Sequence, residues 1–135
     1  MAILVTGGLG YIGSHTVVEL LNNNFEVVII DDLSNTEKFI LKNIEEITGK
    51  KPIFYPFDLK RKELLKQVFD AHKIEGCIHF AAYKAVGESQ VKPIDYYENN
   101  LFSLINLLQE MKERNISNFI FSSSCTVYGQ ADTMP

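Results

Sequence analysis

The sequence predicts an α/β fold with a doubly wound parallel sheet, and two patterns support that class. Short apolar runs of strand length alternate with amphipathic stretches of helix length, which is typical of parallel strands joined by crossover helices. A glycine-rich turn at residues 7–13 separates the first apolar run from the first amphipathic stretch. The 135 residues, of which 46% are hydrophobic and 22% charged, fit a single domain spanning residues 1–135.

The first three elements form one βαβ unit. A strand is expected at residues 2–5, and a helix at 11–21 follows because its apolar residues recur at helical spacing. Three successive asparagines, residues 22–24, end this helix before a second apolar strand at 26–30.

The next helix and strand indicate which strand lies at one edge of the sheet. Apolar residues repeat at intervals of three and four between residues 36 and 48, and Gly49 is expected to close that helix. The third strand, residues 53–57, contains Pro56, which cannot donate a ladder hydrogen bond. This strand is therefore expected at a sheet edge, as in the strand order 3-2-1-4-5.

The remaining elements continue the alternation. We expect helices at residues 60–72 and 93–114, and strands at 76–80 and 118–121. The long helix carries an apolar stripe that we predict to face the sheet, formed by Ile94, Tyr97, Leu101, Leu104, Leu108 and Met111.

Composition argues against several classes of function. The chain has 13 basic and 17 acidic residues, for a net charge of −4, so nucleic-acid binding is not expected. It shows no signal peptide and no apolar run of membrane-spanning length, and we expect a cytoplasmic protein without a membrane partner. Cys77, Cys125 and the three histidines lack metal-ligand spacing, so we predict reduced thiols and no metal site.

The glycine turn carries the main functional signal. It satisfies both Gly8-x-Gly10-x-x-Gly13 and Gly7-x-x-Gly10-x-x-Gly13, between a strand and a helix start where a phosphate can approach main-chain N–H groups. Asp31 ends the second strand 18 residues after Gly13 (31 − 13), close to the spacing expected for a ribose-binding acid. The combination predicts a Rossmann-like dinucleotide-binding domain.

Acidic residues at two strand ends indicate which dinucleotide binds. Asp31 and Asp32 can accept a hydrogen bond from a ribose 2′-hydroxyl and would repel a 2′-phosphate, which favours NAD over NADP. Alternatively, both cap the following turn with Ser34 and Asn35. Asp58 ends the third strand and is either a ligand-binding residue or a helix N-cap.

Two further segments follow strands that lie beside or near the first. After the fourth strand, the small residues Ala81 and Ala82 would let a cofactor approach the backbone, and Lys84 would pair with its oxygens or remain solvated. After the fifth strand, residues 122–124 are serines whose hydroxyls can hydrogen-bond a substrate.

Three motifs together resemble a known family over essentially the whole chain. They are TGGLGYIGSHT at residues 6–16, HFAAYKAVGESQVKP at 79–93 and FIFSSSCTVYG at 119–129. In these motifs the chain resembles the amino-terminal part of the UDP-glucose 4-epimerases, which belong to the extended short-chain dehydrogenase/reductases. Related dehydratases carry Thr-Asp-Glu where this chain has Ser124-Cys125-Thr126, so the acid pair used for elimination is missing.

The resemblance implies a reaction and a set of site residues. The reaction inverts carbon 4 of a UDP-hexose by moving a hydride to tightly bound NAD and returning it to the opposite face. Ser124 would contact the sugar hydroxyl as the catalytic residue. The residues that the resemblance assigns to the cofactor are Gly7, Gly10, Tyr11, Ile12 and Gly13 for pyrophosphate, Asp31, Asp32, Asn35 and Thr36 for the adenosine ribose, Asp58 and Leu59 for adenine, Phe80, Ala81, Ala82 and Lys84 for the nicotinamide side, and Asn99 and Ser122.

One of these positions conflicts with the helical pattern. Asn99 falls on the polar arc opposite the predicted stripe, whereas Asn100 lies nearer to it. Either the first turn after Pro93 is irregular or Asn99 belongs to a solvated face.

The general base that the resemblance implies, a tyrosine followed four residues later by a lysine, does not occur in this sequence. We therefore expect a fragment that ends before the base, the last strands and the substrate domain. Two functions stay open: the NAD-dependent epimerase, or another nucleotide-sugar epimerase or dehydratase of its kind, and a non-catalytic NAD-binding module. The resemblance also implies a homodimer, although core burial would equally explain the wide apolar arc of the long helix.

Overall fold

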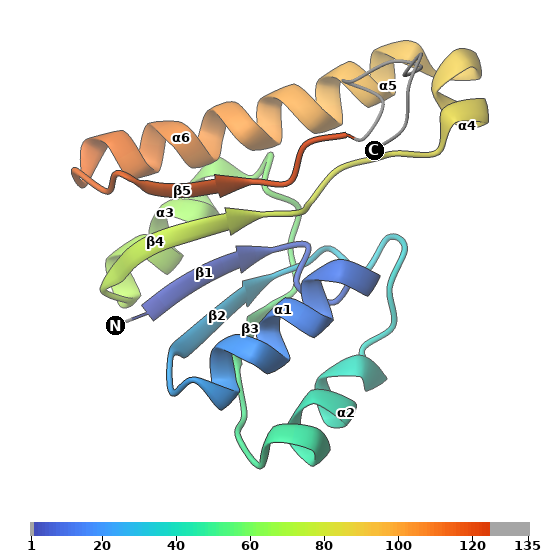
Figure 1. Cartoon of the computed structure of the whole chain (residues 1–135). Helices are drawn as coiled ribbons and strands as arrows, with labels where there is room; N and C mark the ends of the chain where they lie inside the picture. The colour runs from blue at the N-terminus through green and yellow to red at the C-terminus, as the bar shows by residue number, and fades with distance from the viewer. Residues whose placement is uncertain (1, 125–135) are drawn as a thin grey trace, which may run out of the picture.

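The computed structural model describes residues 2–124, which form a five-stranded parallel sheet flanked by helices (Figure 1). The strands lie in the order β3-β2-β1-β4-β5, and all four neighbouring pairs are parallel. The strand order predicted from the sequence is confirmed, as is the edge position of β3. The bounds of the strands are β1 Ala2–Thr6, β2 Glu26–Ile30, β3 Ile53–Tyr55, β4 Ile74–His79 and β5 Asn118–Phe121.

Helices cover both faces of the sheet (Figure 1). The helices are α1 Tyr11–Asn22, α2 Phe39–Thr48, α3 Lys62–Ala71, α4 Val86–Val91, α5 Pro93–Tyr97 and α6 Ser103–Glu113, with a π-helical turn η1 Glu98–Phe102 between α5 and α6. None of the helices within residues 2–124 is long and apolar enough to span a membrane.

Each face of the sheet has its own hydrophobic core. Val17 and Leu21 of α1 and Ile44 of α2 pack with Val5 and Ile29 of the sheet. On the other face, side chains of α3 and α6 pack against alternate residues of the same strands, among them Leu4, Val28, Leu65, Leu107 and Met111. Burial on both faces explains why the central strands read as continuous apolar runs.

The boundaries of several elements differ from the prediction. Strand β3 ends at Tyr55, before Pro56, and β4 begins at Ile74. Helix α2 begins at Phe39 rather than at residue 36, and Gly49 closes it with φ +67° as predicted. The short helix α4 was not predicted, because the stretch before Pro93 lacks an apolar period.

The long helix predicted at 93–114 is divided, and its expected core face was wrong. Of the predicted stripe, Ile94, Tyr97, Leu101 and Leu108 are exposed and only Met111 is fully buried. The buried residues of this stretch are instead Tyr96, Asn99, Ser103, Leu107, Glu110 and Met111. Most of the predicted apolar stripe therefore lies on the outer surface of the molecule.

Candidate functional site

The glycine turn connects β1 to α1 at the carboxyl edge of the sheet. The Gly7 N–H donates to the Ile30 carbonyl at 2.8 Å, and the Gly10 N–H donates to the Gly7 carbonyl at 3.1 Å. Gly10 is the N-cap of α1, and no side chain of the described residues caps the helix there. The first N–H groups of α1, beginning at Tyr11, therefore point out of the helix end without an intrahelical partner, as an anion site requires.

The glycines of this turn meet different surroundings. A Cβ at Gly7, whose φ is +67°, would lie 2.7 Å from the Ala81 nitrogen, and a Cβ at Gly13 would lie 2.2 Å from the Gly7 oxygen. A Cβ at Gly10 would meet only the Gly7 oxygen, at 3.3 Å. Packing inside the protein thus requires glycine at positions 7 and 13, whereas the glycine at position 10 leaves space on the outside of the turn.

The carboxylate of Asp31 holds this turn from the end of β2. Its Oδ2 accepts from the Leu9 N–H at 3.1 Å, and its Oδ1 accepts from the Leu33 N–H at 3.0 Å and the Thr36 hydroxyl at 2.8 Å. Asp31 is buried, with 7% of its surface exposed. Asp31 therefore does cap the following turn, but its partners are the Leu33 N–H and the Thr36 hydroxyl and not Ser34 and Asn35.

The other predicted adenosine-side residues surround Asp31. Asp32 and Asn35 are exposed, and Asp32 Oδ1 accepts from the Ser34 N–H at 2.9 Å. Asp58 Oδ1 accepts from the Lys60 N–H at 2.8 Å, which makes a turn before α3, and the N-cap of α3 is Arg61. Asp58 thus caps the turn that begins at Lys60, as that alternative expected, but it is not the N-cap of α3 itself.

Leu59 lies next to Asp58 but its side chain belongs to the core between the sheet and α3. Its backbone carbonyl accepts from Asn106 Nδ2 at 3.1 Å. A contact between Leu59 and a ligand would therefore involve its main chain.

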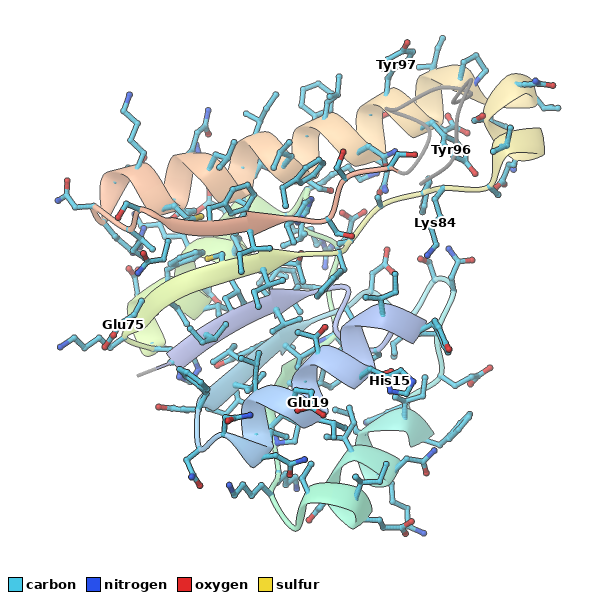
Figure 2. The ribbon with its side chains drawn as sticks, viewed as in Figure 1. His15, Glu19, Glu75, Lys84, Tyr96 and Tyr97 are labelled. Atoms are coloured by element: carbon cyan, nitrogen blue, oxygen red, sulfur yellow. The ribbon has the colours of Figure 1, made fainter. Side chains whose placement is uncertain are left out.

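The segment after β4 lies directly against the glycine turn. The Phe80 N–H donates to the Thr6 carbonyl at 3.0 Å, which carries the β1–β4 ladder into the loop. Ala81 is half-buried beside Gly7, whereas Ala82 and Lys84 are exposed. Figure 2 shows Lys84 on this loop, at the same end of the molecule as Tyr96.

A buried polar contact joins β1 and β4 beneath this loop. Thr6 Oγ1 and His79 Nδ1 are 2.6 Å apart, and both residues are almost fully buried. Burial lowers the pKa of His79 to about 4, so the ring is neutral at pH 7. Sequence reasoning treated His79 only as an ordinary histidine, although a polar pair at the ends of two apolar strands was a visible signal.

Cys77 on β4 is a second buried group. It is a free thiol, and burial raises its pKa to about 12. This thiol is therefore protonated and unreactive at neutral pH. Cys125 lies outside the described residues.

The buried face of this helical stretch resolves the conflict over Asn99. Asn99 is buried, with 8% of its surface exposed, on the same side as Tyr96 and Ser103, because the predicted stripe opposite to it faces outward. The solvated-face alternative is wrong, and the first turn after Pro93 is the regular helix α5, with the irregular turn η1 coming one turn later. The neighbouring Asn100, which the sequence analysis did not assign to the site, hydrogen-bonds the backbone of Tyr83.

Two serines of the predicted site leave the sheet at β5. The Ser122 N–H donates to the His79 carbonyl at 3.1 Å, and the Ser122 and Ser124 side chains are exposed. Ser122 and Ser124 therefore lie at the carboxyl edge of the sheet, as do the glycine turn, Asp31, Asp58 and Lys84.

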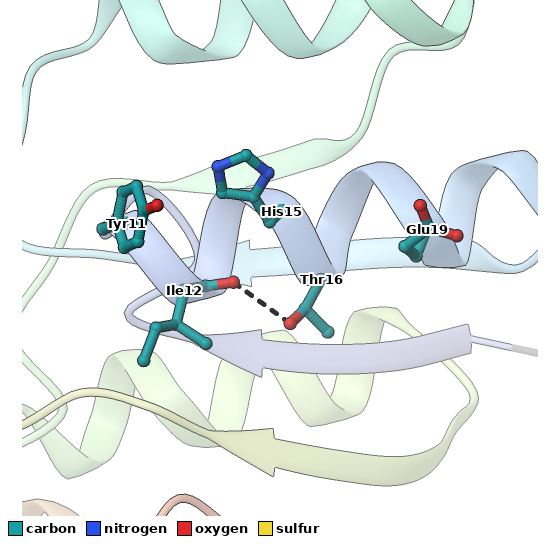
Figure 3. Close-up of a pocket in the computed structure, with 5 residues that line it drawn as sticks. All are labelled: Tyr11, Ile12, His15, Thr16 and Glu19. Carbon is teal, nitrogen blue, oxygen red and sulfur yellow. Dashed lines mark hydrogen bonds between the residues drawn. The ribbon is translucent and has the colours of Figure 1, made fainter.

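A shallow cavity of about 440 Å³ lies along α1 from its first turn (Figure 3). Tyr11, Ile12, His15, Thr16 and Glu19 line it along the side of the helix, and the Tyr11 and His15 rings meet edge to face at 5.2 Å. The Tyr11 and Ile12 side chains thus point outward, and their backbone N–H groups are what α1 offers to a ligand at its N-terminus. Within residues 2–124, no group of three metal-ligating side chains is assembled.

Comparisons with known proteins agree with this geometry. The chain is 53% identical over 135 residues to the UDP-glucose 4-epimerase of Pasteurella multocida (strain Pm70), covering 100% of this chain and 40% of that protein. It is 47% identical to a UDP-glucose 4-epimerase of Klebsiella pneumoniae, covering 100% of this chain and 97% of that sequence.

A solved structure gives the same result for the fold. The UDP-glucose 4-epimerase of Bifidobacterium longum, in complex with NAD⁺ and UDP, superposes with a TM-score of 0.96 at 46% identity, over 100% of this chain and 40% of that one. The chain thus spans about two fifths of the length of the first curated relatives it matches, 40% in each case. The model of the NAD dependent epimerase/dehydratase family matches residues 3–135, and the chain belongs to that family.

Proposed function

We propose that the protein is a UDP-glucose 4-epimerase, which interconverts UDP-glucose and UDP-galactose with a tightly held, reused NAD. The observation that carries the proposal is the turn at Gly10. A Cβ at Gly10 would meet only one protein atom within 4 Å, the Gly7 oxygen at 3.3 Å, so internal packing does not require glycine there. The absence of a side chain leaves space beside the first N–H groups of α1. A diphosphate is the ligand that such a turn accepts.

The candidate residues extend to both sides of the glycine turn, as binding of the two halves of NAD would require, and their chemistry suits that ligand. The pyrophosphate would lie on Gly7, Gly10 and the N–H groups of residues 11–13. The adenosine half would lie toward Asp31, Asp32, Asn35, Thr36, Asp58 and Leu59, and the nicotinamide half toward Phe80, Ala81, Ala82, Lys84, Asn99 and Ser122. Asp31 already accepts three internal hydrogen bonds, so we assign the ribose hydroxyls to Asp31 and Asp32 together.

Bound NAD would supply the hydride acceptor at carbon 4 of the sugar. Ser124, exposed at the end of β5, would orient the sugar hydroxyl and pass its proton toward a base. Lys84 would place its ammonium near ribose or phosphate oxygens at the opposite side of the same edge. The neutral His79 beneath the loop takes no proton near pH 7 and would act only through its contact with Thr6.

The sequence at Ser124 favours epimerisation over dehydration. A dehydratase needs acids for elimination, and residues 124–126 are Ser-Cys-Thr. The test is incubation of the protein, expressed as its gene encodes it, with UDP-galactose, followed by chromatography of the nucleotide sugars. We expect UDP-glucose, whereas a 4-keto-6-deoxy product would support a dehydratase instead.

A second candidate, a non-catalytic NAD-binding module, is favoured by one observation. None of the six tyrosines among the 135 residues is followed four positions later by lysine. We therefore expect residues 1–135 alone to give no epimerase turnover, because the tyrosinate base is missing. Turnover by pure polypeptide of these residues would contradict the assignment of the base.

We further propose that the protein works in the cytoplasm as a homodimer. The free thiol of Cys77 suits a reducing compartment. The outer apolar surface of α5, η1 and α6 supports self-association, because a contiguous set of large side chains is exposed there, namely Ile94, Tyr97, Leu101, Phe102, Ile105 and Leu108. In Figure 2, Tyr97 points away from the sheet on this outer side.

A further inference from the structure

The side-chain amide of Asn100 makes a two-point contact with the loop after β4. Asn100 Oδ1 accepts from the Tyr83 N–H at 2.8 Å, and Asn100 Nδ2 donates to the Tyr83 carbonyl at 2.9 Å. The amide therefore pairs with one residue of backbone as a neighbouring strand would. Residues 81–85 belong to no helix or strand, so this contact supplies hydrogen bonds to the Tyr83 backbone that no ladder supplies.

Asn100 and its neighbour Asn99 both belong to the π-helical turn η1. In η1 both are withdrawn from solvent, and Asn99 Nδ2 donates to Asn100 Oδ1 at 3.2 Å. Asn100 Oδ1 thus receives two N–H groups, which fixes the amide in the orientation that Tyr83 requires.

The same loop is held a second time, two residues further on. The Tyr96 hydroxyl contacts the Ala85 carbonyl at 3.1 Å and Glu88 Oε2 at 2.9 Å, and the Tyr83 and Tyr96 rings lie 5.5 Å apart. With Gly7 packed against Ala81, the loop is fixed at its beginning, middle and end. Ala82 and Lys84 alternate with the held positions and are exposed toward the site edge.

We propose that Asn100 is a positioning residue: it fixes the Tyr83 backbone and so aims Ala82 and Lys84 at the nicotinamide half of the dinucleotide. This role rests on the proposed function, because it presupposes that NAD lies along the carboxyl edge of the sheet. The adenosine half would be held by β2 and β3, which Asn100 does not contact. Loss of the contact should therefore weaken binding of NAD but not of a ligand that ends at the diphosphate.

Two substitutions of Asn100 distinguish the effect of its hydrogen bonds from the effect of its side-chain size. Asn100→Asp keeps the size and one acceptor but turns a carboxylate oxygen toward the Tyr83 carbonyl, and Asn100→Leu removes both bonds. Asn118→Asp is the matched control, because Asn118 Nδ2 donates to the Glu75 carbonyl at 2.9 Å at the opposite edge of the sheet. All three would be made in the protein as its gene encodes it.

The experiment measures affinities for NAD and for ADP by calorimetry, after removal of co-purified nucleotide. We expect both Asn100 variants to bind NAD about tenfold more weakly, as the loss of two backbone contacts implies, and to bind ADP within about twofold of the unsubstituted protein. Asn118→Asp should change neither affinity. Unchanged NAD affinity, or an equal loss for NAD and ADP in both variants, would overturn the positioning role.

The same measurement distinguishes failure of the proposed function. If the unsubstituted protein binds neither NAD nor ADP, the dinucleotide site itself is refuted, and the role of Asn100 with it. If it binds ADP and NAD equally well and the Asn100 variants do the same, only the positioning role is lost.

Discussion

Gly10 and Gly13 lie on the same turn, and the space around each predicts opposite consequences of adding one methyl group. At Gly13 the new Cβ would overlap the Gly7 oxygen and also come within 2.9 Å of the Gly8 Cα. At Gly10 it would need only a small shift of the Gly7 carbonyl, but it would occupy the space that we assign to phosphate. One glycine thus serves folding and the other serves binding.

We predict that Gly13→Ala destabilises the protein by about 3 kcal/mol, since backbone atoms cannot move aside without disrupting the turn. Gly10→Ala should change stability by about 1 kcal/mol at most but abolish detectable NAD binding. Urea unfolding and calorimetry with NAD test the pair. Gly87→Ala is the control, because a Cβ at Gly87 would meet nothing within 4 Å. Unimpaired NAD binding by Gly10→Ala would contradict our account of the turn.

His79 predicts a pH dependence of stability. Its pKa is about 4 in the folded protein and near the ordinary value of about 6.5 when unfolded, so the unfolded chain takes up the proton first as the pH falls. The stabilisation is complete above about pH 6.5 and is lost as the pH falls toward 4. Between pH 7 and pH 5 this group should account for about 2 kcal/mol of lost stability.

The measurement is the free energy of unfolding in urea at pH 7 and at pH 5. His79→Asn should lower stability at pH 7 and should lose about 2 kcal/mol less than the unsubstituted protein between the two pH values. The exposed His15 provides the comparison, and His15→Asn should keep the original pH dependence. An unchanged pH dependence in His79→Asn would show that other groups are responsible.

At the scale of the elements, α3 and α6 are joined by one arginine. Arg114 Nη1 contacts Glu110 Oε2 at 2.5 Å, its Nη2 pairs with Asp70 of α3, and its guanidinium lies 5.3 Å from the centre of the Phe69 ring. Glu110 has only 1% of its surface exposed, whereas the Asp70 side chain is 57% exposed. The buried pair therefore matters more than the surface pair.

We predict that Arg114→Leu destabilises the protein by about 3 kcal/mol, because it leaves the Glu110 carboxylate buried without its cation. Asp70→Asn should cost less than about 1 kcal/mol. The double variant Glu110→Leu with Arg114→Leu should recover much of the loss, which thermal or urea unfolding will measure. Equal destabilisation by the single and the double variant would show that lost packing of the Arg114 side chain, not an unpaired Glu110 carboxylate, causes the loss.

The same elements show where sequence reasoning succeeds and where it stops. Strand positions followed from apolar runs and Pro56, since burial on both faces leaves little choice of residue. The inner face of α6 did not follow, because Ile105 and Leu108 are as apolar as a core stripe yet lie outside. The inward placement of Asn99 and the contact of Asn100 with Tyr83 did not follow either, because polar residues on a buried helix face give no apolar period.

The candidate site residues also divide into features that the sequence predicts and features that it does not. The positions at strand ends were predictable because parallel strands bring their carboxyl ends to one edge. The three hydrogen bonds of Asp31 were not, since they depend on the path of the turn after β2.

For the molecule as a whole, the outer surface of α5, η1 and α6 is the feature that predicts assembly. We expect Ile105→Lys together with Leu108→Lys to convert the dimer to a monomer, since two charges would be placed in an apolar contact. Glu113→Lys, an exposed substitution at the end of α6, should leave the dimer intact. Light scattering after gel filtration gives the mass, and a monomer before substitution would refute the proposed dimer.

The close approach of Gly7 to Ala81 has a consequence for how this sequence changes over generations. The two positions belong to segments distant in the sequence, yet the Ala81 backbone occupies the space that a side chain at Gly7 would need. A side chain at Gly7 would require β1 and β4 to move apart, which would break the ladder that continues through Thr6 and Phe80. Backbone packing alone therefore selects against substitution of Gly7, independently of any ligand.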